Sequence, residues 1–382
     1  MNVWIKWSLI ASLLLLSPGC FDSKPIQNMA YVTAIGLDYK DGVFISYAQV
    51  LNFLNVAKSD KNEIGKNIPV WIGRGTGKTV TESLSSLSET SQIRLFWGHV
   101  KSVVVDEELL KSQAIVRQSY EAINRYREVR YNILLYSTKT PIVDIFKQKS
   151  ILNLPVLDTI LDTPEDTHAQ RSNIDPQYGF KFIAEFNEPG NTAIIPTIGI
   201  TKEVWKEDAR KMPMFKITGA FFIRQNEKLS WFSETELLGR RWVQKENKRS
   251  VLLIGNPEAP TATLVIIKPN YRIRYVKNSK PLQFKIEIKA RAYVEEMIKD
   301  ASVKEMEVLA AKAIRDEMMA TYEKGLATQT DLLNLFAELY RSEPKLWHQL
   351  HNSKQLLLNQ KTLGQIDVKV TITNTGKYKG RL

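Results

Sequence analysis

The sequence predicts an α+β protein of two or three domains, in which mostly antiparallel or mixed sheets are covered by helices. Three observations support this prediction. Leu282–Val294 alternates between apolar and polar residues, as a half-buried strand does. Ser302–Glu323, which follows, has apolar residues at helical spacing. Of the 382 residues, 43% are apolar and 25% are charged, which is typical of a folded chain with a sizeable core.

The N-terminal region begins with a predicted hairpin. Met29–Asp38 and Val43–Val50 are rich in β-branched and apolar residues, and an Asp-Gly turn separates them. Thr79 and Glu82 have the spacing of a capping box, so a helix is expected to begin there.

Further strands and helices continue this region. Val100–Val105 and Tyr131–Tyr136 are expected strands. The acidic run from Asp106 is expected to begin a helix, because carboxylates favour a helix N-terminus. Thr163–Gln177 is polar and contains prolines, so a loop is expected there.

The pattern changes near residue 190. Ala193–Ile200 and Phe215–Arg224 are expected strands. Ser233, with Glu236 three positions later, is expected to cap a helix that continues to Lys245.

The C-terminal region alternates strands and helices. The expected strands are Ala262–Ile267, Tyr271–Val276, Leu282–Val294 and Ile366–Thr373, and the expected helices are Ser302–Glu323 and Gln329–Tyr340. The expected divisions are a signal peptide (1–19), an N-terminal α+β domain (20–195), a small middle domain (196–260) and a C-terminal antiparallel sheet with long helices (261–382).

The first residues are typical of an exported bacterial lipoprotein. Lys6 precedes an apolar stretch, Ser8–Leu16, that is too short to span a bilayer. Gly19 stands before Cys20, as in a lipobox, although Ser17 occupies the position that usually holds leucine. Cys20 is the only cysteine and cannot form an internal disulfide, so we expect it to carry lipid that holds the protein on the outer face of a membrane. The alternative is an ordinary secretory signal in which the cysteine has no role.

The net charge of +12 limits the partners of an exported protein. Anionic lipid headgroups, an anionic cell-wall polymer or an acidic protein would fit this charge. Nucleic acid is not expected, because the protein would lie outside the cytoplasm. A basic surface that only contacts solvent is the alternative.

One basic face is a possible interface. Lys285, Lys289 and Arg291 alternate with apolar residues, so a strand would place them together on its outer face. They could contact anionic headgroups or an acidic loop of a membrane protein, or they could simply be solvated.

The segment Gly73–Thr79 resembles a phosphate-binding P-loop. A P-loop requires glycine five positions before Gly77, and Ile72 stands there. We therefore expect a flexible glycine loop before a helix, and no nucleotide cofactor.

The histidines give no clear metal site. His348 and His351 are three apart on a possible helix, but no third ligand accompanies them, so a surface or packed pair is expected. His168 lies near Asp162 and Glu165 in the expected polar loop, which is more typical of solvated charges than of a cation site. No nucleophile with a recognisable base is found. The sequence therefore predicts no catalytic residue, metal or cofactor, and a protein that is not an enzyme.

Several blocks resemble the Ger(x)C spore-germination lipoproteins, the C subunits of nutrient germinant receptors in endospore-forming bacteria. They occur in the family's order over essentially the whole mature chain: Gly19–Asp22, Tyr31–Asp38, Phe96–Leu109, Ile217–Phe222 and Leu238–Gly239. Phe21 stands where the family often has tryptophan.

The resemblance implies a lipid-anchored, three-domain α+β protein on the outer surface of the spore inner membrane. It would act beside an A subunit and a membrane-spanning B subunit in germination triggered by small nutrients, and the family offers no catalytic residue to transfer. Whether this subunit binds a nutrient stays open. The alternatives are a solute-binding lipoprotein of a transporter, which would have two lobes of alternating parallel strands and helices, and an exported cell-wall hydrolase. A structure without a deep interdomain cleft would favour the receptor subunit over both.

Overall fold

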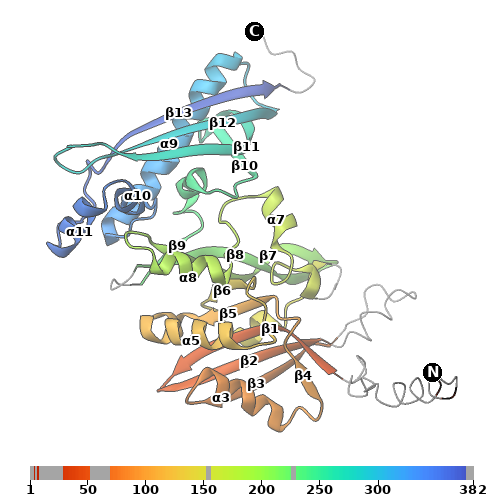
Figure 1. Cartoon of the computed structure of the whole chain (residues 1–382). Helices are drawn as coiled ribbons and strands as arrows, with labels where there is room; N and C mark the ends of the chain where they lie inside the picture. Colours follow the sequence, from red (N-terminus) through yellow and green to blue (C-terminus); the bar gives the residue numbers. More distant parts are fainter. Residues whose placement is uncertain are drawn as a thin grey trace.

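In a computed structural model the chain folds into two sheets covered by helices (Figure 1). The structure describes residues 29–51, 69–151, 156–224 and 229–375, together with Trp4 and Trp7. Cys20 lies outside the described residues, so its lipidation stays a prediction. In the described part of the chain, no helix is long and apolar enough to cross a membrane.

The larger sheet has nine strands, in the order β3-β2-β1-β5-β6-β7-β8-β9 with β4 beside β1. They are β1 (Met29–Lys40), β2 (Val43–Leu51), β3 (Trp71–Gly77), β4 (Arg94–Phe96), β5 (Ser102–Asp106), β6 (Leu134–Thr138), β7 (Ala193–Glu207), β8 (Arg210–Ile223) and β9 (Ser230–Ser233). Residues 30–37 of β1 are buried without interruption, because helices or loops cover both faces of the sheet there.

This sheet is mixed, as expected. The β1–β2–β3 and β7–β8–β9 groups are antiparallel, whereas β1, β5, β6 and β7 pair in parallel. Parallel neighbours require long crossovers, and helices supply them. The helices of this region are α3 (Val80–Ser86), η3 (Leu87–Glu89), α4 (Glu107–Leu110), α5 (Gln113–Arg125), α6 (Ile142–Phe146), η5 (Val156–Asp158), α7 (Pro164–Gln170) and α8 (Gly179–Asn187).

The smaller sheet has the strand order β10-β11-β12-β13 and is covered by α9. Its elements, with the short helix that leads to it, are η6 (Leu238–Val243), β10 (Arg249–Asn256), β11 (Ala259–Tyr275), β12 (Phe284–Met297), α9 (Val303–Thr328), α10 (Leu335–Ser342), α11 (Pro344–Asn352) and β13 (Leu363–Asn374). The predicted alternation of β12 is confirmed, since its apolar residues are buried. From α9, Met306, Ala310 and Ile314 pack fully buried against them.

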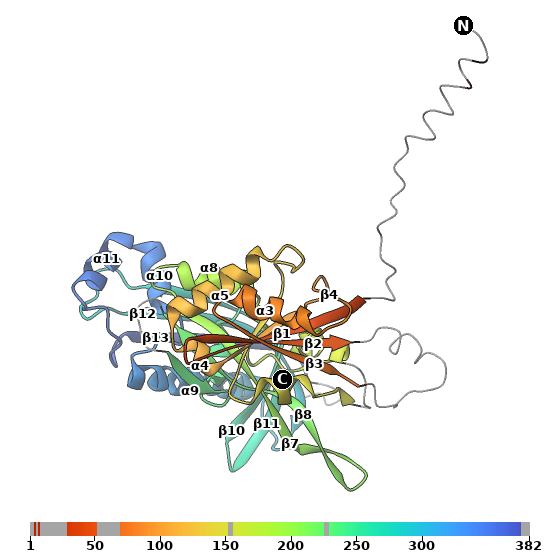
Figure 2. The ribbon, with the colours of Figure 1, turned by 90° about the horizontal axis from the view of Figure 1, so that it is seen from below.

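The two sheets occupy separate parts of the molecule (Figure 1). The larger sheet forms the lower part in that view, and the smaller sheet with α9–α11 forms the upper part. The far end of the β7–β8 hairpin projects from the body (Figure 2). The expected boundary at 195/196 falls within β7, and the division into three domains stays a prediction.

The prediction of an antiparallel C-terminal sheet is wrong for one strand. β13 pairs in parallel with β12, because α9, α10 and α11 form a crossover that returns the chain to the same end of the sheet. The two strands expected over residues 262–276 are one strand, β11, whose register shifts between Ile267 and Asn270.

The α-helix expected from Ser233 to Lys245 is wrong. The capping interaction forms, since Ser233 Oγ accepts a hydrogen bond from the Glu236 N–H (3.3 Å) and donates one to its carboxylate (2.8 Å). Only a short 3₁₀ helix, η6, follows. All of residues 239–243 are buried, whereas a surface α-helix would bury one face.

Two expected loops are also wrong. Thr163–Gln177 contains α7, which begins with a proline in its first turn and two acidic residues, both favourable at a helix N-terminus. The glycine-rich segment is strand β3. A Cβ at Gly75 would lie 2.0 Å from the carbonyl oxygen of Ser83, so the missing side chain lets α3 pack directly on the strand.

Candidate functional site

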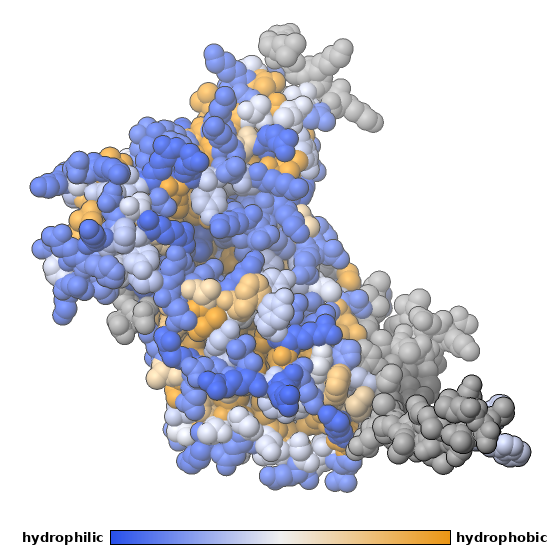
Figure 3. Space-filling view, in the orientation of Figure 1, coloured by the Kyte–Doolittle hydropathy of each residue, from blue (hydrophilic) through white to orange (hydrophobic). Residues whose placement is uncertain are grey.

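A cleft of about 920 Å³ lies where the two parts of the molecule meet. Its walls come from α8, η6, α10 and the segment of β11 around the register shift. The surface is hollowed between the lower and upper parts in Figure 3. Small-molecule sites are typically clefts of this size at domain boundaries, so this cleft is the candidate functional site.

Arg240, from η6, lies on the inner wall of the cleft. It is 8% exposed, and its guanidinium stands over the ring of Phe222, 5.3 Å from the centroid. Its Nη1 donates a hydrogen bond to the carbonyl of Leu332, whereas its Nε has no hydrogen-bond partner among the described residues. Burial lowers the pKa of Arg240, and the negative charge of Glu185 opposes this shift.

Polar side chains around α8 form the facing lining. Glu185 accepts a hydrogen bond from Gln177 Nε2 (2.8 Å). Burial raises the pKa of Glu185, and the charge of Arg240 opposes this shift. Asn191 is 5% exposed, and its Nδ2 donates to Glu188 Oε2 (3.3 Å). The Oδ1 of Asn191 has no hydrogen-bond partner in the described part of the chain.

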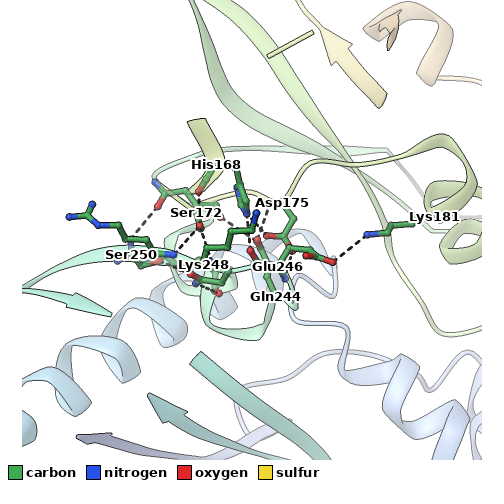
Figure 4. Close-up of polar contacts among 12 residues, drawn as sticks. His168, Ser172, Asp175, Lys181, Gln244, Glu246, Lys248 and Ser250 are labelled. Carbon is green, nitrogen blue, oxygen red and sulfur yellow. Dashed lines mark hydrogen bonds and ion pairs between the residues drawn. The ribbon is translucent and has the colours of Figure 1, made fainter. Parts of the chain in front are cut away.

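A polar network borders the cleft and ties the segment after α7 to the segment before β10 (Figure 4). His168 Nε2 lies 3.0 Å from the Glu246 carbonyl oxygen and 3.3 Å from Asp175 Oδ1. The backbone N–H of Asp175 donates to Gln244 Oε1 (3.0 Å), and its Oδ2 accepts from the Glu246 N–H (3.2 Å). Ser172 Oγ accepts two backbone N–H bonds at the start of β10 (3.0 and 3.1 Å). These bonds hold two walls of the cleft together.

The residues beside Arg240 fix η6 on α9. Gly239 N–H donates to Thr321 Oγ1 (2.9 Å). Arg241 forms a bidentate ion pair with Glu317, with a shortest distance of 2.7 Å, and the fully buried Trp242 donates its Nε1–H to the same carboxylate (2.8 Å). Because its neighbours bind α9, Arg240 is held in place against the cleft.

The predicted basic face lies elsewhere. Lys285, Lys289 and Arg291 are on the outer face of β12, and none of them lines the cleft. Lys285 is compensated, since its Nζ lies 2.7 Å from Asp367 Oδ2 and 3.5 Å from Glu287 Oε1. Lys289 and Arg291 are exposed, and no ion pair to either is found among the described residues.

The histidines have structural contacts. His348 and His351 are exposed, and each contacts the ring of the buried Trp347; the ring of His351 stacks on it with centroids 4.6 Å apart. They are therefore surface residues that pack on Trp347, within the expected surface or packed pair. His168 is not in a solvated run, because it is buried in the network described above. Within the described ranges, no three His, Cys, Asp or Glu side chains are grouped to hold a metal ion.

The cleft could not be predicted from the sequence. Its residues come from segments far apart in the chain and match no motif. The one available signal was the pair Arg240-Arg241 between Gly239 and Trp242, since two adjacent arginines in an otherwise buried segment each need a partner.

Comparisons with known proteins cover both parts of the chain. The domain described as "Spore germination protein N-terminal domain" matches residues 22–200, and "Spore germination B3/GerAC like, C-terminal" matches residues 218–376. The chain is 22% identical to spore germination protein KC of Bacillus subtilis (strain 168), over 91% of each chain. The crystal structure of the GerBC protein is similar in fold, with a TM-score of 0.53 and 17% identity over 89% of this chain and 97% of that one.

Proposed function

The chain belongs to the Ger(x)C family of spore germination proteins, and on this basis we propose that it is a non-enzymatic, lipid-anchored subunit of a nutrient germinant receptor. The observation that carries this proposal is the match of both family domains, in order, over nearly the whole chain. The subunit would lie on the outer surface of the spore inner membrane, beside the A and B subunits of the receptor.

The lipobox-like sequence at Cys20 supports the anchor. Nine residue steps separate Cys20 from Met29, the start of β1, and they span at most about 30 Å. A lipid on Cys20 would therefore keep this end of the larger sheet close to the membrane.

The same end of the sheet carries exposed apolar side chains. By strand register, the start of β1 lies beside β4 and near the start of β3. Trp71 at the start of β3 is 71% exposed, and Ile93 just before β4 is 50% exposed. Tryptophan is favoured at membrane–water interfaces, so these residues support a membrane-facing role for this end. The basic face of β12 lies in the other part of the molecule (Figure 1), which favours contact with a partner subunit over contact with the same bilayer.

The alternative, a solute-binding lipoprotein of a transporter, is less well supported. Such a protein would have two lobes of alternating parallel strands and helices, whereas long antiparallel pairs dominate both sheets here. Absence of a cleft would have favoured the receptor subunit. A cleft is present, so this criterion does not distinguish the receptor subunit from the solute-binding protein.

Replacement of the cysteine tests the anchor. Cys20→Ala should abolish metabolic labelling with a fatty acid and leave the protein uncleaved or released from the membrane fraction. Labelling of the variant at the level of the parent would contradict the lipoprotein assignment.

Deletion of the gene tests the receptor role. Spores that lack the protein should lose germination with some nutrients in a screen, while uptake of the same nutrients by growing cells is unchanged. Lost uptake with normal germination would instead favour the transporter.

A further inference from the structure

Two neighbouring arginines in η6 have opposite environments. Arg241 shares its charge with Glu317 through a bidentate ion pair. Arg240 is equally buried, yet no ion pair to it is found in the described part of the chain, and its guanidinium has one hydrogen bond, to Leu332. The charge of Glu185 acts on Arg240 without forming an ion pair with it. A buried charge without a close partner is costly, and natural proteins usually compensate it. Arg240 therefore has binding capacity that the fold does not use.

A second buried polar group in the cleft is also unsatisfied. Asn191 lines the cleft, and its Oδ1 has no hydrogen-bond partner among the described residues. The orientation of its amide is fixed, because the carboxylate of Glu188 can only accept and so must face Nδ2. An acceptor is therefore left for a donor from outside the chain.

These two groups define a complementary ligand. The planar guanidinium of Arg240 matches a carboxylate, and Asn191 Oδ1 matches a hydroxyl or ammonium group. The cleft volume of about 920 Å³ exceeds what such a small molecule needs. Tyr271 and Glu185 also line the cleft and could complete the polar contacts.

We propose that the cleft binds a small organic carboxylate that also carries a hydroxyl or ammonium group, with Arg240 as the anion partner and Asn191 as the acceptor. The proposal concerns this chain alone. Its failure would leave the receptor role untouched, since a receptor subunit need not bind a ligand itself.

A matched set of three-carbon compounds tests the chemistry. The purified full chain in detergent is titrated with lactate, alanine, propionate and lactamide, and binding is measured by saturation-transfer NMR, which detects dissociation constants in the millimolar range. Lactate or alanine should bind about tenfold more tightly than propionate, which lacks the donor, and than lactamide, which lacks the charge. The preferred one of the two identifies a hydroxy acid or an amino acid as the natural class.

Variants assign the residues. Arg240→Lys keeps the charge but loses the planar fork, and Asn191→Ala removes the acceptor; each should weaken binding about tenfold. Tyr271→Phe removes only a hydroxyl from the cleft lining, and it should also weaken binding. This variant keeps the proposal testable if the Arg240 variant does not accumulate. Lys289→Gln removes an exposed positive charge outside the cleft and should leave binding unchanged. Absence of binding by all four compounds at about 10 mM, or binding by the Arg240, Asn191 and Tyr271 variants equal to that of the parent, would overturn the proposal.

Discussion

The ion pair between Arg241 and Glu317 joins η6, on the cleft wall, to the long helix α9. The side chain of Arg241 is 6% exposed and that of Glu317 is 22% exposed. We predict that Glu317→Gln, which removes the charge but keeps an oxygen for the Trp242 N–H, destabilises the protein strongly. The reason is that Arg241 would stay buried without a counter-charge.

The expected cost follows from the burial of the pair. Removing one partner of a buried ion pair typically costs about 3–5 kcal/mol, and we expect about 3 kcal/mol because the amide oxygen still accepts a hydrogen bond. Burial raises the pKa of Glu317 although Arg241 opposes that shift, so desolvation is a large cost of the intact pair. The double variant Arg241→Met with Glu317→Gln should therefore regain most of the lost stability.

A double-mutant cycle measures this coupling. Urea unfolding of the parent, both single variants and the double variant is followed by tryptophan fluorescence, to which the fully buried Trp242 contributes. A coupling energy of about 2–3 kcal/mol is expected. A value below about 0.5 kcal/mol would refute the argument that the pair acts as a unit.

Three further predictions concern other parts of the structure. Gly239→Ala should lower stability by about 1–3 kcal/mol in thermal unfolding, because a Cβ would lie 2.2 Å from the backbone oxygen of Glu317; a stability equal to the parent would contradict the close approach. The pKa of Glu185 is raised in the folded protein, so ionisation of this carboxyl destabilises the fold as the pH rises through that pKa. Glu185→Gln should therefore raise the thermal unfolding midpoint near pH 7 but not near pH 3. A higher midpoint at both pH values would contradict this cause. Lys289→Glu with Arg291→Glu should preserve folding, because both are exposed, and should reduce co-purification with the receptor's membrane subunits; unchanged co-purification would mean that this face is only solvated.

The double charge reversal leaves out Lys285 for a structural reason. We expected all three cations of β12 to be equivalent, but Asp367 of β13 pairs with Lys285. Strand alternation predicts which side chains share a face, whereas the charges on the neighbouring strand depend on pairing that only the fold defines. A glutamate at position 285 would meet two acidic neighbours, Glu287 and Asp367, and would confuse loss of stability with loss of binding.

Local features were determined by the sequence alone. The alternation in β12, the apolar stripe of α9 and the cap at Thr79 depend on residues a few positions apart, and the structure has the corresponding strand and helices. The order of the family motifs also identified the family. These features need no knowledge of distant contacts, because hydrogen bonding and side-chain periodicity act within one element.

Tertiary structure decided the rest. The parallel pairing of β13 depends on where three helices return the chain, and the short η6 replaces the expected α-helix because its residues are buried between α9 and the cleft. The cleft brings Asn191 of one part beside a wall formed by Arg240 and the bulge of β11. The sequence does not show which of these polar groups lacks a hydrogen-bond partner. Their unmet hydrogen bonds exist only because packing excludes solvent from them, and packing is a property of the whole fold.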